Sequence, residues 1–254
     1  MKKVLFCLIT LFVCVGLFAQ QQSTIEVTTD ASGTLFLSDV EIGVLWVNNT
    51  HKIPMERFGT YILRLQLFNG KSKVISILID TQGVKKVDFS TIAESYIIGS
   101  TGPAGGIIFY DKGDNSDGWR YLEAAPVETE FRNIEWGRGI NVPGTSKIIG
   151  SGKHNTELIV ERLIKTKKTR QAAQLCDALN FGGFDDWFLP SRDELDLMYK
   201  NLRVKDLGGF RHTYWSSSQN RKKDAHVQDF GNNSGRLHIN NKFDKRSARA
   251  IRSF

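Results

Sequence analysis

The chain has 254 residues, a formal net charge of +7 and three cysteines. The length suggests about two domains. Cys7 and Cys14 fall in an N-terminal apolar segment, so the rest of the chain keeps only Cys176 and cannot form an internal disulfide; hydrophobic cores must stabilise it. The positive charge gathers near the end, because residues 200–254 carry 13 basic and four acidic residues, a local net charge of +9. Such an imbalance points to an anionic partner or surface.

Residues 1–19 read as a signal peptide. Lys2 and Lys3 precede an uncharged apolar run over residues 4–18, which is too short for a membrane span, and Ala19 is small enough for a cleavage site. We therefore expect an exported protein, located in the periplasm, on the cell surface or outside the cell, with no membrane span. Two alternatives stay open: a retained N-terminal anchor, and lipidation of Cys14.

Residues 20–89 predict a small β-sandwich. Strand-like segments alternate with turns, and Asn69-Gly70 is typical of a hairpin turn between strands over residues 61–67 and 73–79. The pattern of residues 33–61 resembles a PEGA-type surface β-domain, without its signature tetrapeptide. Domains of that type act as spacers. We place a linker at residues 90–95 and a second domain at residues 96–254.

Residues 183–195 organise the second domain. Trp187, Phe188 and Leu189 predict a short buried strand that stops at Pro190. Ser191, followed by Glu194 three residues later, predicts a capping box at the start of an amphipathic helix.

Further elements lie on either side of this stretch. A helix with Leu158 and Leu163 on its apolar face is expected to be capped by Asn155 or Thr156. A second helix over residues 172–179 would bury Cys176 as a core residue rather than expose it as a nucleophile. Strands are predicted over residues 213–218 and 248–254, with a hairpin over 227–239. Strands, then helices, then strands again indicate an α+β fold.

Five ordered motifs in the second domain resemble a known family. They are residues 102–113 (GPAGGIIFYDKG), 150–153 (GSGK), 186–191 (DWFLPS), 214–218 (YWSSS) and 249–252 (RAIR). Together they look like the C-terminal domain of Lcl-type collagen-like adhesins, a former domain-of-unknown-function family. The resemblance implies a C-type-lectin-like fold related to formylglycine-generating enzymes, an extracellular role and binding of sulfated glycosaminoglycans. The chain has no Gly-X-Y stalk, so trimerisation is not carried over and the oligomeric state is left open.

The residues do not point to catalysis. A formylglycine-generating enzyme needs two reactive cysteines, whereas one remains here. His154, His212, His226 and His238 lack metal-ligand spacing. Trp215 is followed by three serines, which differs from the calcium-binding triplets of lectins with this fold. We expect no catalytic residue, no metal and no cofactor, and a divergent enzyme of the formylglycine-generating group is the remaining enzymatic alternative.

Basic side chains are the candidates for binding, because arginine forms forked charge-assisted hydrogen bonds with sulfate and phosphate groups. The candidate residues are Lys167, Lys168, Arg170, Arg221, Lys222, Lys223, Arg236, Lys242, Lys245, Arg246, Arg249 and Arg252. They predict a calcium-independent, adhesin-like module for an anionic, sulfated polysaccharide. The alternative is a protein–protein interaction or envelope-structural module, and nucleic acid is not expected as a partner. Basic clusters on one face would favour the polyanion, and an exposed apolar patch would favour a protein.

Overall fold

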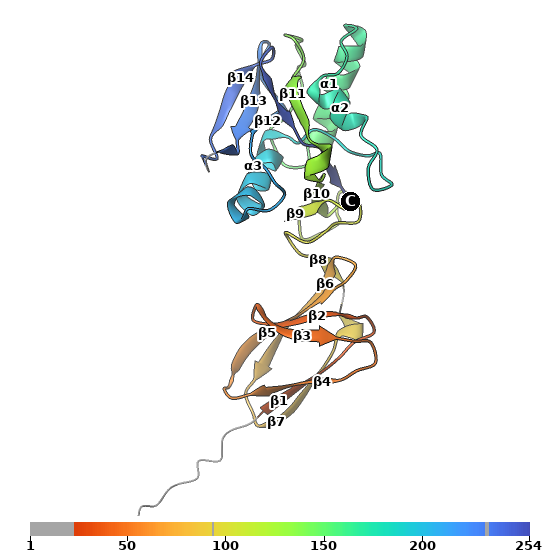
Figure 1. The fold of residues 1–254 in the computed structure, drawn as a ribbon, viewed down its shortest axis with the longest axis vertical. Helices are drawn as coiled ribbons and strands as arrows, with labels where there is room; N and C mark the ends of the chain where they lie inside the picture. Colours follow the sequence, from red (N-terminus) through yellow and green to blue (C-terminus); the bar gives the residue numbers. More distant parts are fainter. Residues whose placement is uncertain (1–22, 93, 232–233) are drawn as a thin grey trace, which may run out of the picture.

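The computed structural model describes residues 23–92, 94–231 and 234–254. Two bodies follow one another along the long axis, and the C-terminus lies close to their junction (Figure 1). The predicted signal peptide, with Cys7 and Cys14, lies outside the described residues. Within those residues, no helix combines the length and the apolar character needed to cross a membrane.

The N-terminal body is a β-sandwich, as its alternating pattern predicted. One sheet has the order β4-β1-β7 and the other the order β3-β2-β5-β6-β8. Leu63 and Leu65 of β5 face Ile25 and Val27 of β1 across a buried core, because alternate residues of a strand point to the same side. The bounds are β1 Ser23–Thr28, β2 Gly33–Leu37, β3 Val40–Leu45, β4 His51–Met55, β5 Gly59–Leu67, β6 Lys71–Ile79, β7 Gly83–Asp88 and β8 Ser95–Tyr96.

Strand β8 joins the two bodies. It pairs with β6, while the ring of Tyr96 contacts Tyr121 and Phe254 of the second body at 5.3 Å between centroids. The 3-10 helix η1 (Phe89–Thr91) precedes it. The expected linker at residues 90–95 thus overlaps the end of η1 and the start of β8.

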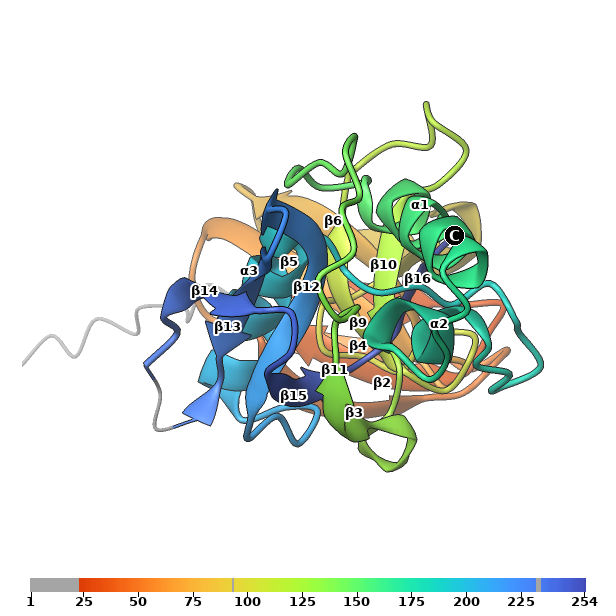
Figure 2. The same ribbon diagram turned by 90° about the horizontal axis from the view of Figure 1, so that it is seen from above.

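The C-terminal body contains two further sheets, ordered β16-β10-β9 and β11-β15-β12-β13-β14. The helices α1 and α2 lie on the opposite side of this body from β13 and β14 (Figure 2). The bounds are β9 Ile107–Asp111, β10 Tyr121–Ala124, η2 Val127–Thr129, β11 Phe131–Glu135, α1 Gly152–Lys165, α2 Ala172–Asp177, α3 Arg192–Asn201, η3 Arg203–Lys205, β12 Thr213–Arg221, β13 Asp224–Asp229, β14 Leu237–Asn241, β15 Lys245–Ala248 and β16 Ile251–Ser253.

The capping box predicted before α3 is confirmed. The Ser191 hydroxyl accepts a hydrogen bond from the Glu194 backbone N–H, and the Glu194 carboxylate accepts one from the Ser191 backbone N–H at 2.7 Å. Trp187, Phe188 and Leu189 are buried as expected, but Phe188 forms only an isolated bridge with Ile251 rather than a strand. Residues 187–189 are therefore a core segment that is stabilised mainly by side-chain packing and only slightly by backbone hydrogen bonds to a neighbouring strand.

The N-cap predicted for helix α1 is wrong. Helix α1 begins at Gly152 with Ser151 as its N-cap, so Asn155 and Thr156 lie inside the helix. Both are buried and bonded elsewhere: the Asn155 amide donates to the Ser146 carbonyl at 2.7 Å, and the Thr156 hydroxyl accepts from the Leu189 N–H at 3.0 Å. These hydrogen bonds join α1 to the loop that precedes it and to the segment at Leu189, and they do not cap the helix.

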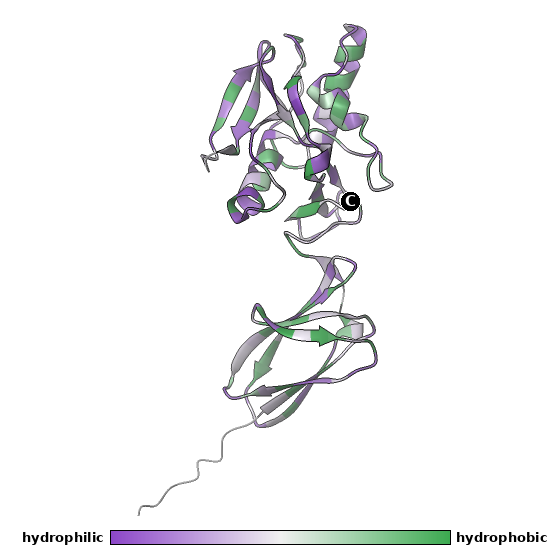
Figure 3. Cartoon of the chain, viewed as in Figure 1, coloured by the Kyte–Doolittle hydropathy of each residue, from purple (hydrophilic) through white to green (hydrophobic). Residues whose placement is uncertain are grey.

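The predicted α+β class, with a C-type-lectin-like mixed domain, is also wrong. Of the described residues, 41% lie in strands and 17% in helices, arranged around four sheets, so the chain is β-sandwich-rich. The error has a local cause. Strands β11 (FRNIE) and β15 (KRSA) carry too many polar residues to show an alternating pattern, and pairing with each other makes them strands. Strand β11 carries both hydrophilic and hydrophobic colours in Figure 3, so hydropathy alone does little to distinguish it from a loop.

Candidate functional site

The twelve basic candidates fall into three groups in the structure. Three are buried: Lys242, Arg249 and Arg252. Six lie in two turns away from any shared pocket. The remaining three, Arg236, Lys245 and Arg246, line one groove. The structure therefore brings together only a part of the predicted set.

Arg249 and Arg252 are structural, and their prediction as ligand contacts is wrong. Arg249 donates to Glu130 at 2.7 Å and lies over the Phe210 ring at 4.6 Å. Arg252 bridges Glu123 at 3.4 Å and Asp186 at 2.8 Å. Both guanidinium groups are buried against carboxylates brought from distant parts of the chain, so neither can reach a ligand in the folded protein.

Lys242 is buried without a carboxylate within ion-pair distance among the described residues, and its prediction as a ligand contact is wrong as well. Its Nζ donates to the Ile140 carbonyl at 2.9 Å and to the Gln219 side chain, and it lies 4.0 Å from the centre of the Trp136 ring. Burial lowers the pKa of this lysine to about 7. Its role is to hold the loop at Ile140 against β12.

Two predicted clusters lie away from the groove, with every side chain exposed except Lys168, which is half-buried. Lys167, Lys168 and Arg170 occupy the turn between α1 and α2. Arg221, Lys222 and Lys223 form the tip of the β12–β13 hairpin and are all exposed. Neither cluster contributes to the groove lining, so each is explained as a solvated turn.

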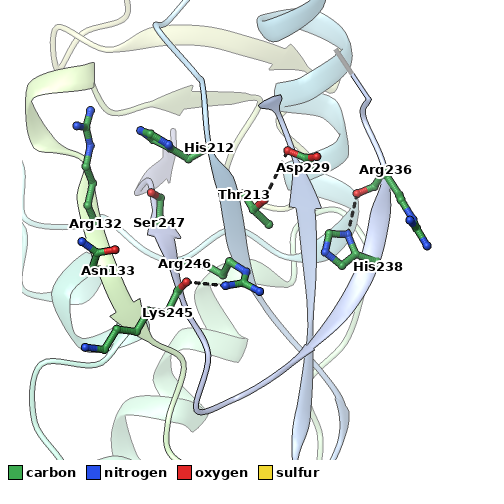
Figure 4. Close-up of a pocket in the computed structure, with 10 residues that line it drawn as sticks. All are labelled: Arg132, Asn133, His212, Thr213, Asp229, Arg236, His238, Lys245, Arg246 and Ser247. Atoms are coloured by element: carbon green, nitrogen blue, oxygen red, sulfur yellow. Dashed lines mark hydrogen bonds between the residues drawn. The ribbon is translucent and has the colours of Figure 1, made fainter. Parts of the chain in front are cut away.

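The groove has a volume of about 540 Å³ and crosses the five-stranded sheet (Figure 4). Each of the strands β11, β15, β12, β13 and β14 contributes to it. Arginine, lysine and histidine side chains dominate the lining. The lining residues are Arg132, Asn133, His212, Thr213, Asp229, Arg236, His238, Lys245, Arg246 and Ser247.

A β-bulge places Arg132 at the first edge of the groove. The register between β11 and β15 shifts between Phe131 and Ile134, and Asn133 adopts a left-handed conformation with φ of 55°. Asparagine is one of the residues that tolerates this region, and a bulge re-aims the side chains beside it. Sequence reasoning missed Arg132 because a single arginine in a short polar strand carries no clustering signal.

Glu130 lies beside the groove and connects it to the core. Its carboxylate accepts hydrogen bonds from Tyr214 at 2.6 Å, Arg249 at 2.7 Å and Arg132 at 2.9 Å, with His212 3.6 Å away. Burial alone would raise the pKa of Glu130, but the bonds from Tyr214 and Arg249 outweigh it and hold the pKa below its usual value. The same network raises the pKa of the Tyr214 phenol, chiefly through burial. The hydrogen bond to Glu130 therefore holds the Arg132 side chain beside the groove.

Two cations of the groove form no ion pair with any described residue. These are Arg236 and Lys245, both exposed. Arg246, by contrast, lies 3.6 Å from Asp244 and donates to the Asn240 side chain at 3.3 Å. Unpaired, exposed cations beside paired ones leave net positive charge in the groove, which favours an anionic ligand.

The glycine-rich motifs serve the interior of the protein. The carboxylate of Glu123 accepts from the Gly106 N–H at 2.7 Å and the Ala104 N–H at 3.2 Å, and a Cβ on Gly102 would lie 2.4 Å from the Glu123 side chain. Burial raises the pKa of Glu123 despite these bonds. The N–H groups that could have bound a phosphate are therefore occupied by a carboxylate of the protein itself.

The second glycine motif, residues 150–153, also packs against a buried carboxylate of the protein. Glu194 accepts from the Gly150 N–H at 2.7 Å, and a Cβ on Gly152 would lie 2.2 Å from its Oε2. Burial raises the pKa of this carboxyl group. The motif joins the start of α1 to the start of α3, as a packing requirement.

Metal-ligating side chains are scattered over the described part of the chain, and its cysteine is buried. They contain no group of three or more His, Cys, Asp or Glu side chains arranged to hold a metal ion. Cys176 is fully buried, and burial raises the pKa of its thiol. His226 is half-buried, and burial, with Lys147 and Arg192 nearby, lowers its pKa to about 4.

Comparison with known proteins assigns no family. No family model matches the chain, and no curated protein matches it. Among solved structures, the chain is similar to a fimbrial protein from Bacteroides ovatus ATCC 8483, with 11% identity and a TM-score of 0.43 over 92% of this chain and 71% of that one. The resemblance to Lcl-type adhesins therefore stays a prediction, and function has to be argued from the residues of the chain itself.

Proposed function

We propose that the protein is an exported, non-enzymatic binding module whose groove recognises an anionic, sulfated polysaccharide without calcium. The observation that carries the proposal is the convergence of Arg132, Arg236, Lys245 and Arg246 on one groove, with Arg236 and Lys245 free of ion pairs among the described residues. Forked guanidinium groups suit sulfate oxygens. The resemblance to Lcl-type adhesins, which remains a prediction, implies the same ligand class.

The shape of the groove suits an extended chain. Arg132 belongs to β11 at one edge of the sheet, and His238 to β14 at the other. Four inter-strand steps of about 4.8 Å separate the two edges, a span of about 19 Å. A linear polysaccharide lying across the strands would meet Arg132 at one edge and Arg236, which directly precedes β14, at the other, and this favours a polymer over a single small anion.

The test is retention of the protein on immobilised heparin against a salt gradient. We expect elution above physiological salt, and steep weakening as the Debye length falls from about 10 Å at 0.1 M to about 3 Å at 1 M. A chelator should not change retention. The double variant Arg236→Glu/Lys245→Glu should lower the affinity at least about tenfold, since each exposed contact contributes up to about 1 kcal/mol and reversal adds repulsion.

The matched control is Lys222→Glu/Lys223→Glu. It changes the net charge by the same amount at the β12–β13 hairpin tip, outside the groove. Retention close to that of the wild type is expected. Equal losses in the two double variants would mean diffuse attraction to the whole surface, and elution of the wild type below physiological salt would contradict the proposal.

A protein partner is the second candidate, and a different surface favours it. The outer face of the five-stranded sheet in the N-terminal sandwich exposes Val44, Ile62, Val74 and Leu78, with exposed fractions from 42% to 54%. Their cross-strand partners, such as Arg64 opposite Val74, place them on the side away from the core. An exposed apolar face of this kind is typical of protein interaction sites.

A further inference from the structure

The cationic groove also contains a carboxylate. Among the described residues that line it, Asp229 is the one acidic side chain. The other nearby acids are already engaged, since Glu130 pairs with Arg132 at 2.9 Å and Asp244 with Arg246 at 3.6 Å. Asp229 has no cation among the described residues within 4.0 Å, so it is not part of an ion pair in the groove wall.

The orientation of Asp229 is set by its own turn. Its Oδ1 accepts from the Gly231 N–H at 2.8 Å, its Oδ2 from the Ser234 hydroxyl at 3.0 Å, and the Thr213 hydroxyl lies 3.5 Å from Oδ1. Arg236 is its neighbour across the hairpin, where the Asp229 N–H donates to the Arg236 carbonyl at 3.0 Å. The guanidinium of Arg236 nevertheless points away from the carboxylate (Figure 4).

We propose that Asp229 is a specificity-determining residue: the groove accepts polysaccharides whose anionic groups alternate with free hydroxyl groups, and disfavours uninterrupted polyanions such as polyphosphate. This inference rests on the proposed function. A carboxylate oxygen has several acceptor sites, and the bonds within the turn leave some of them free. A sugar hydroxyl can donate to them, whereas an uninterrupted polyphosphate brings further negative charge and no donor.

The geometry explains why a binding site for anions would keep such a residue. Cations alone attract every polyanion, and discrimination needs an element that penalises the wrong ligand. A fixed carboxylate between cations does this, since like charges repel at short range while a hydroxyl at the same place gains a charge-assisted hydrogen bond. Asp229 thereby requires an uncharged hydrogen-bond donor, such as a sugar hydroxyl, at one position along the polysaccharide.

The experiment measures the affinities of heparin and of inorganic polyphosphate of matched total charge by calorimetry at one fixed salt concentration. The wild-type protein should bind heparin at least about tenfold more tightly. Asp229→Asn, which keeps the size of the side chain and its place in the turn, should raise the affinity for polyphosphate about tenfold and change that for heparin less than about threefold.

The matched control is Asp117→Asn, which removes one negative charge from an exposed side chain outside the groove. It should leave the ratio of the two affinities unchanged. The inference is overturned if Asp229→Asn raises both affinities equally, leaves the polyphosphate affinity unchanged, or acts no differently from Asp117→Asn. Failure of the proposed function looks different, because the wild-type protein would then not bind heparin at all.

Discussion

Replacement of Arg249 with methionine should destabilise the C-terminal body. The Arg249 side chain has an exposed fraction of 0%, and its guanidinium donates to the Ala125 carbonyl at 3.0 Å, the Gly208 carbonyl at 3.2 Å and Glu130 at 2.7 Å. Methionine keeps the apolar stem and removes every donor. Breaking a buried ion pair from one side destabilises by about 3–5 kcal/mol. Tyr214 still donates to Glu130, so we expect about 3 kcal/mol.

Urea unfolding followed by tryptophan fluorescence measures this loss, since Trp119, Trp136, Trp187 and Trp215 all lie in the C-terminal body. The control is Arg236→Met, which removes the same charge from an exposed side chain without an ion pair among the described residues. It should change the free energy of unfolding by no more than about 0.5 kcal/mol. Wild-type stability of Arg249→Met, combined with weakened heparin retention, would refute the structural role and restore Arg249 as a ligand contact.

Two further predictions concern the core. Because burial lowers the pKa of Lys242 to about 7 while an unfolded lysine titrates near 10.5, the unfolded chain binds the proton more readily between these values. The free energy of unfolding should therefore rise with pH across this window, by up to about 1.4 kcal/mol per pH unit, and Lys242→Met should remove that contribution. The free energy of unfolding is measured at pH 7 and pH 9 for both proteins, and an equal rise in the wild type and in Lys242→Met would contradict the prediction. Trp187→Ala should cost the C-terminal body about 3–5 kcal/mol, since the ring is 2% exposed, whereas Trp46→Ala, at 55% exposed, should leave that body unchanged. Similar losses in urea unfolding of the two variants would argue against Trp187 as a core residue.

Local patterns predicted the elements that depend on neighbours in sequence. The Asn69-Gly70 hairpin needs a left-handed glycine, and Gly70 has φ of 84°. The capping box of Ser191 and Glu194 spans three residues and forms as expected. The hairpin of β13 and β14 follows from a glycine-rich turn between two short strands. In each case the interaction that stabilises the element is made within a few residues of it.

The sheet that holds the groove could not be predicted in this way. Strand β15 is stabilised by β11, more than 100 residues earlier, and the bulge at Asn133 becomes defined only through that pairing. The same long-range pairing places Arg132 beside Lys245 and Arg246. Within a single sequence window these segments are polar and look like loops, so neither β11 nor β15 was predicted as a strand.

The sequence by itself determined how much positive charge the C-terminal region carries, but not which of those charges face solvent. Arg236, Arg249 and Arg252 are chemically identical and lie within 17 residues of one another. Only the tertiary structure separates them, because Glu130 lies 119 residues from Arg249 and Glu123 lies 129 residues from Arg252. A buried arginine needs a buried carboxylate. Since folding brings such a partner to two of the three and none to Arg236, only Arg236 keeps an exposed charge for the groove.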